Sequence, residues 1–112
     1  MLIAHRDLTF VTASKDTLKV PVCLFAPEGS DKHWWCRYTI GWPDGTYASK
    51  GYGVDQFQAI WHTMQKIGSD IYFSDYHKAG RLYFENSGSG YGFPVPKSAR
   101  NLLVGDDKRF DG

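Results

Sequence analysis

Apolar and polar positions alternate along the first half of the chain. From Leu2 to Val11, and again from Thr17 to Ala26, Val, Leu and Phe recur with a period close to two, which is typical of half-buried strands. The polar residues at positions 13 to 16, between the two runs, have the composition of a turn. We therefore predict a β-hairpin in this part of the chain.

A third alternating run, from His33 to Trp42, is the most informative strand. Its more apolar face is the predicted core face and carries Trp34, Cys36, Tyr38, Ile40 and Trp42. The Pro-Asp-Gly sequence at 43–45 predicts a chain reversal, because proline presets φ for the first corner and glycine accepts a positive φ at the next. A fourth strand over Thr46 to Ser49 should follow this turn.

A helix is predicted to begin at or near Asp55 and to continue to about Phe73. The Asp55 carboxylate can accept hydrogen bonds from the free N–H groups of the first turn, and Gln58 stands three residues later as the second half of a capping box. Apolar residues then step by three or four. This spacing predicts a core-facing stripe of Val54, Phe57, Trp61, Met64, Gly68 and Ile71.

Together these elements predict an α+β fold, in which an antiparallel sheet of about four strands carries one long amphipathic helix packed on one face. The short aromatic segment 81–85 suits an edge strand, and the Gly- and Ser-rich segment 86–92 suits a flexible loop. We assign residues 2–96 to a single domain and residues 97–112 to a partly flexible C-terminal arm. In this arm we expect a short turn of helix at 98–103 and a frayed end at 106–112.

Net charge and apolar run length disfavour two classes of partner. The chain has 112 residues and a formal net charge of +1, with both signs scattered, which gives no field strong enough to favour nucleic acid or an anionic membrane. The longest uninterrupted apolar run, Val22 to Ala26, is far too short to cross a bilayer, and the charged residues at 5–7 do not suit a signal peptide. We therefore expect a cytoplasmic protein.

The cysteine positions contain no metal or cofactor signature. Cys23 and Cys36 do not form a Cys-x-x-Cys motif, so we expect two free thiols, no metal site and no cofactor. Cys36 lies on the predicted core face, where burial would raise the pKa of its thiol and make it a poor nucleophile. The glycine-rich segment 88–92 lacks the lysine and the following helix of a phosphate-binding loop.

Two histidines are the candidate acid–base groups. His62 shares a helix face with Asp55, but we predict that this face is solvated and offers no orienting partner inside a cleft. His77 stands near Asp75, but it lies at a predicted helix end, where a histidine complements the helix dipole. We therefore predict no catalytic residue. A small hydrolase or ligand-binding enzyme that uses His62 or His77 remains the alternative.

The second face of the sheet is the candidate binding surface. It carries Trp35, Arg37 and Phe25, and aromatic residues with arginine are typical of interface cores. Two interpretations remain open. Either a protein partner or a second copy of the chain uses this face, or the C-terminal segment folds back through Tyr91 and Phe93 and covers it. The predicted binding residues are Trp35, Arg37, Phe25, Tyr91 and Phe93.

Several short motifs accompany these elements. They are Ile-Ala-His-Arg at 3–6, Trp-x-Cys-x-Tyr-x-Ile at 34–40, Gly-Val-Asp-x-x-Gln-Ala at 53–59, Ile-Gly-Ser-Asp at 67–70 and Gly-Phe-Pro at 92–94. Over residues 2–96 the chain resembles a family of small, uncharacterised bacterial proteins. This resemblance implies a bacterial cytosolic α+β domain and transfers no catalytic residue.

We therefore predict a non-enzymatic domain that binds a protein partner or itself. One form of this hypothesis is an immunity or accessory factor, because a small domain that blocks a toxin needs only a surface. A weak nucleic-acid binder is a further alternative. Its basic residues would be those of the arm, Lys97, Arg100, Lys108 and Arg109, although Asp106, Asp107 and Asp111 offset most of their charge.

Overall fold

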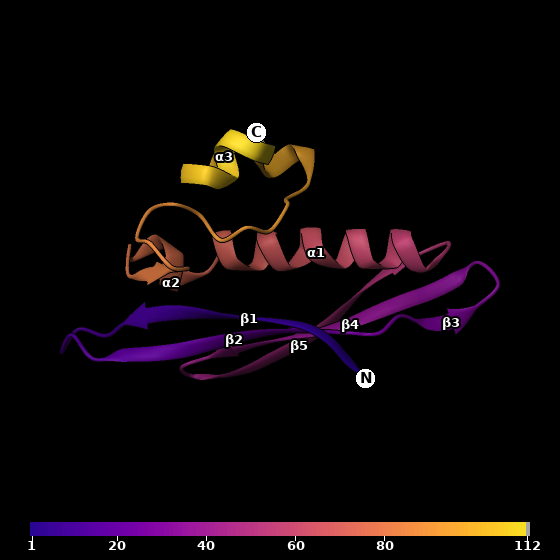
Figure 1. Cartoon of the computed structure of the whole chain (residues 1–112), viewed down its shortest axis with the longest axis horizontal. Coiled ribbons are helices and arrows are strands. Elements are labelled where there is room, and N and C mark those ends of the chain that lie inside the picture. Colours follow the sequence, from indigo (N-terminus) through magenta and orange to yellow (C-terminus); the bar gives the residue numbers. More distant parts are fainter. Residues whose placement is uncertain (112) are drawn as a thin grey trace.

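A computed structural model of the chain describes residues 1–111. The elements in chain order are β1 (Leu2–Val11), β2 (Thr17–Phe25), β3 (Glu28–Ser30), β4 (His33–Trp42), β5 (Gly45–Gly53), α1 (Gln56–Tyr72), α2 (Asp75–Lys78), β6 (Leu82–Tyr83), a 3-10 helix η1 (Lys97–Leu102) and α3 (Gly105–Asp111). Figure 1 shows three layers, with the sheet on one side, α1 along its face, and the C-terminal segment over α1. The α+β class is therefore confirmed.

The sheet is antiparallel and has six strands rather than about four. The strand order is β3-β4-β2-β1-β6, and β5 pairs with β4. The edge strand predicted at 81–85 is present as β6, which has two residues and pairs with β1. The strand β3 was not predicted, because its three residues are too few to produce a long alternating pattern. In contrast, β5 is longer than predicted, because its glycines continue the pairing with β4 as far as Gly53.

The start of α1 is formed as predicted. The Asp55 carboxylate accepts a hydrogen bond from the Gln58 backbone N–H at 2.8 Å, and the Gln58 side-chain oxygen accepts one from the Val54 N–H at 2.8 Å. These two bonds satisfy backbone donors that have no partner within the helix.

Among the described residues, no helix combines the length and the apolarity that a membrane span needs.

The predicted core stripe of α1 is wrong in its first two turns. Phe57 is 86% exposed, Val54 is 54% exposed and Trp61 is 49% exposed. Gly68 and Ile71 of the predicted stripe are buried, but the other buried residues of the helix are Ala59, Thr63, Ile67 and Tyr72. The helix is therefore rotated about its own axis, away from the orientation that would bury the whole predicted apolar stripe against the sheet.

Close contact between α1 and β5 explains this rotation. A Cβ atom placed on Gly51 would lie 2.7 Å from the Thr63 backbone nitrogen, and one placed on Gly53 would lie 2.7 Å from the Gln58 carbonyl carbon. The helix thus touches the backbone of the strand, and only small residues fit between them. Ala59 fits this space, whereas a phenylalanine or tryptophan does not.

The predicted core face of β4 is confirmed. Cys36, Tyr38 and Ile40 are fully buried, and Trp34 and Trp42 are partly buried against the same core. Burial of these side chains between the sheet and α1 supplies the main hydrophobic driving force of the fold.

The C-terminal segment forms the third layer. A Cβ atom on Gly68 would overlap the Pro94 carbonyl oxygen, so the chain at Pro94 lies directly against α1. Tyr91, Val95, Ala99 and Leu103 are buried there. The predicted helical turn at 98–103 corresponds to η1. The segment in which we expected a frayed end contains α3 up to residue 111, and Gly112 lies outside the described residues.

Candidate functional site

The C-terminal segment lies on the α1 side of the sheet and leaves the opposite face bare (Figure 1). Tyr91 is 3% exposed and belongs to the core with α1, and Phe93 packs beside it. The predicted binding residues therefore form two separate groups. Trp35, Arg37 and Phe25 lie on the bare face, and Tyr91 and Phe93 do not cover it.

The bare face has a defined arrangement on β4 and β5. Trp35 is directly opposite Tyr52, and Arg37 is directly opposite Lys50. The Lys50 ammonium lies 5.7 Å from the Trp35 ring centroid and 5.8 Å from that of Tyr52, which are cation–π distances. We call this surface, with the Phe25 side chain from β2, the outer face.

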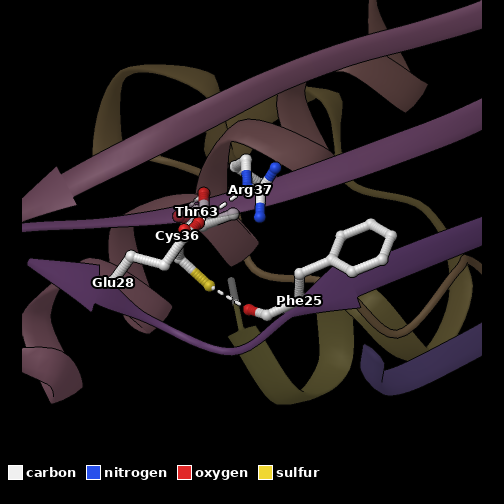
Figure 2. Close-up of polar contacts among 5 residues, drawn as sticks. All are labelled: Phe25, Glu28, Cys36, Arg37 and Thr63. Carbon is white, nitrogen blue, oxygen red and sulfur yellow. Dashed lines mark hydrogen bonds and ion pairs between the residues drawn. The ribbon is translucent and has the colours of Figure 1, made fainter. Parts of the chain in front are cut away.

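Glu28 of β3 orients Arg37 on the outer face. The Arg37 Nε donates to the Glu28 carboxylate at 2.6 Å, and the two side chains are 58% and 40% exposed. An ion pair this exposed contributes about 0–1 kcal/mol to stability, so its main effect here is to hold the guanidinium in place. Figure 2 shows this pair beside Cys36 and Phe25.

Cys36 has a structural position below the outer face. Its thiol donates to the Phe25 carbonyl oxygen at 2.8 Å, while the Phe25 ring points away from the sulfur (Figure 2). Burial raises the pKa of the Cys36 thiol, with a smaller opposing effect from Thr63. Cys23 and Cys36 are both free thiols, as predicted. A buried thiol with a raised pKa is almost entirely protonated at neutral pH, so little of the nucleophilic thiolate is present.

Two hollows adjoin the outer face, and both are lined in part by Tyr52. One has a volume of about 440 Å³ and is lined by Arg37, Ala48, Ser49, Lys50, Tyr52 and Lys66. The other has a volume of about 430 Å³ and is lined by Lys32, His33, Trp34, Trp35, Tyr52, Gly53, Val54 and Gln58. The first hollow is basic and the second is largely aromatic.

A second cluster, which could not be predicted from the sequence, consists of hydrogen bonds that hold the C-terminal segment against α1. Asp107 is 5% exposed, and one of its carboxylate oxygens accepts from the Tyr72 hydroxyl at 2.5 Å and the Tyr91 N–H at 2.7 Å. The other oxygen accepts from the Gly92 N–H at 2.7 Å. We call this arrangement the Asp107 clasp. Nothing in the local sequence marks Asp107, since it stands in a polar stretch with another aspartate beside it.

The pKa values of both tyrosines in the Asp107 clasp reflect the buried carboxylate. Burial, and then the carboxylate of Asp107, raise the pKa of Tyr72 and also the pKa of Tyr91, the latter to about 12. Both hydroxyls therefore stay protonated at neutral pH. The Asp107 carboxylate receives three donors, which is the arrangement expected of a structural anchor.

The two candidate histidines have different surroundings. His62 is exposed, as predicted, and its Nδ1 lies 2.7 Å from the Tyr52 carbonyl oxygen. His77 is in the last turn of α2, and its Nδ1 lies 2.5 Å from the Tyr91 hydroxyl. A cavity of about 260 Å³ is lined by His77 and Tyr91 together with Leu82, Tyr83, Val104 and the loop at 87–90. Among the described residues, no three His, Cys, Asp or Glu side chains converge as metal ligands.

His77 is expected to make the free energy of unfolding fall as pH drops below about 6.5. Burial lowers the pKa of His77 below its ordinary value of 6.5, so the folded state favours the neutral ring. The unfolded chain takes up the proton first as pH falls. The stabilisation is therefore present above pH 6.5 and is lost as pH falls through the lower folded pKa. Urea unfolding at a series of pH values measures this loss.

The His77→Gln variant isolates this contribution. The difference in unfolding free energy between the native chain and His77→Gln should shrink as pH falls. A constant difference for His77→Gln would show that the histidine titrates alike in both states.

Comparisons with known proteins place the chain in a family without a known role. No curated protein and no solved structure matches the chain. The family model for a domain of unknown function (DUF6968) matches residues 4–95, which is most of the chain and agrees with the resemblance noted from the sequence motifs. The chain therefore belongs to the DUF6968 family of domains of unknown function.

Proposed function

We propose that this chain is a non-enzymatic binding domain that docks another protein on its outer face. The observation that carries this proposal is the alignment of Trp35 with Tyr52 and of Arg37 with Lys50 on a sheet face that no other segment within residues 1–111 covers. Tryptophan, tyrosine and arginine are the residues most enriched where binding energy concentrates in interfaces. Tyr52 is 58% exposed, so this surface is accessible to a partner.

Charge favours a different protein over a second copy of the chain. In a twofold symmetric dimer the same patch faces itself, so Arg37 and Lys50 of one copy would lie near the same cations of the other. Like charges placed together in an interface are unfavourable. A role of this kind is that of an immunity or accessory factor in the bacterial cytoplasm, where blocking or chaperoning a partner needs a surface and no reactive group.

A site-specific photo-crosslinker tests this proposal. With the photoreactive residue p-benzoylphenylalanine in place of Tyr52, we expect irradiation of the native cells to join the chain to one defined protein. With the same residue in place of Lys19, which is exposed on β2 near the other end of the sheet, we expect no such product. The partner is then purified, and Trp35→Asp should weaken its binding at least tenfold.

Sedimentation of the pure chain completes the test. We expect a monomer at high concentration. Crosslinks from position 52 to a second copy alone would identify a homodimer, and equal crosslinking from positions 19 and 52 would show that the outer face is not a docking surface. Products that disappear after nuclease treatment would indicate nucleic acid instead.

A further inference from the structure

Two hollows lie along the edge of β5 that does not pair with β4. Within the described residues β5 pairs only with β4, so its other edge has no strand neighbour. The basic hollow of about 440 Å³ and the aromatic hollow of about 430 Å³ both reach Tyr52, which stands near the end of this strand. Two chemically different hollows therefore adjoin along one edge.

Lys66 and Lys50 make the first hollow basic. The Lys66 ammonium donates to the Lys50 carbonyl oxygen at 2.8 Å and to the Ser49 hydroxyl at 3.0 Å, which fixes the charge of this α1 side chain at the strand edge. Arg37 is paired with Glu28, whereas neither lysine forms an ion pair within the part of the chain described. Lys66 also acts electrostatically on the Asp70 carboxylate of α1, so Lys50 is the cation of the hollow that is most available for an anionic ligand.

The second hollow offers aromatic surface. Trp34, Trp35 and Tyr52 line it together with Val54, which is 54% exposed. The Trp34 indole N–H already donates to the Asp31 carbonyl oxygen at 2.8 Å, so that ring has a fixed orientation. An apolar or aromatic side chain would bury these surfaces without leaving the indole donor unpaired.

We infer that the partner binds through an acidic segment that carries a large apolar or aromatic side chain. The acidic residues lie over Lys50 and Lys66, and the apolar side chain enters the hollow beside Trp35. This inference rests on the proposed function and specifies the chemistry of its partner. Charge complementarity supplies the argument, since two lysines outside any ion pair, beside the aromatic rings that line the second hollow, favour such a segment.

A single-stranded nucleic acid also combines negative charge with groups that stack on aromatic rings. The charges of the first hollow favour a protein segment, because nucleic-acid binding depends on many phosphate contacts, and here one of the three cations is already paired with Glu28. The net charge of the whole chain is only +1, which gives no wider field for a phosphate backbone.

Fluorescence anisotropy with a defined probe tests the inference. The probe is a fluorescein-labelled peptide with four consecutive glutamates followed by tryptophan and leucine. We expect saturable binding that weakens at least tenfold with Lys50→Glu and is retained with Lys50→Arg. The matched control is Lys19→Glu, which makes the same charge change on the outer side of β2 and should leave the affinity unchanged. Probes with glutamine for glutamate, or serine for tryptophan and leucine, should each bind at least tenfold more weakly.

Four results would overturn the inference. These are equal binding of the glutamine probe, equal loss in the Lys50→Glu and Lys19→Glu variants, absence of saturable probe binding, and tighter binding of a ten-nucleotide thymidine strand than of the peptide. If position 52 still crosslinks to a partner whose affinity does not change with Lys50→Glu, the partner chemistry is wrong and the proposed function stands. If no protein crosslinks to position 52, the proposed function itself fails.

Discussion

Replacing Gly51 with alanine is expected to destabilise the chain by about 3 kcal/mol, at the upper end of the usual cost of overpacking. The added methyl group would lie 2.7 Å from the Thr63 backbone nitrogen and 2.8 Å from its Cα. Both atoms belong to the helix backbone and cannot move as a flexible side chain does. The helix must therefore shift away from β5, and the packing of the core residues beneath it is lost.

Thermal and urea unfolding measure this effect. For a domain of this size the midpoint should fall by roughly 12 °C or more. The matched control is Ala48→Val, which adds bulk to an exposed position on the same strand and should change stability by less than about 0.5 kcal/mol. If Gly51→Ala were as mild as Ala48→Val, the close contact between α1 and β5 would be incorrect.

Replacing Asp107 with asparagine is expected to cost roughly 2 to 4 kcal/mol through loss of the Asp107 clasp. The two oxygens of the carboxylate accept from the Tyr72 hydroxyl, the Tyr91 N–H and the Gly92 N–H. An asparagine side chain has one oxygen, so its amide N–H₂ must face at least one of these donors. That donor loses its partner in a buried environment.

The loss should concentrate in the third layer. Hydrogen exchange at the Tyr91 and Gly92 amides should speed up strongly, whereas amides in the middle of β4 should change little. Asp106→Asn is the matched control, because Asp106 is the exposed neighbour and its replacement should leave both exchange and stability nearly unchanged. Uniform acceleration across the sheet would show that the third layer does not open separately from the rest.

Local sequence patterns predicted which face of β4 is buried and where α1 begins, because both depend on residues that are close together in the chain. The alternation of Trp34, Cys36 and Tyr38 identified the buried face of β4, because side chains alternate across any strand. The cap at Asp55 was likewise predictable, since its bond spans three residues. The outer-face residues Trp35 and Arg37 were found by the same alternation.

Contacts between distant segments could not be predicted in this way. Hydrophobic spacing placed Phe57 and Trp61 in the core, but it carries no information about how closely α1 approaches β5. The glycines at 51 and 53 set that distance, and it admits only small side chains. Tyr52 and Lys50 were missed as outer-face residues, because β5 was predicted to end at Ser49.

The sequence by itself determined the strands β1, β2 and β4, the capped helix and the chemistry of each face of β4, because these depend on periodicity and on groups a few residues apart. Only the tertiary structure decided the side of the sheet to which the C-terminal segment packs. Arg6 donates to the Tyr91 carbonyl oxygen at 2.8 Å across 85 positions of the chain, and Asp107 bonds Tyr72 across 35. Such contacts form only when the segments are brought together by burial of the core, so the bare outer face follows from packing and not from any local pattern.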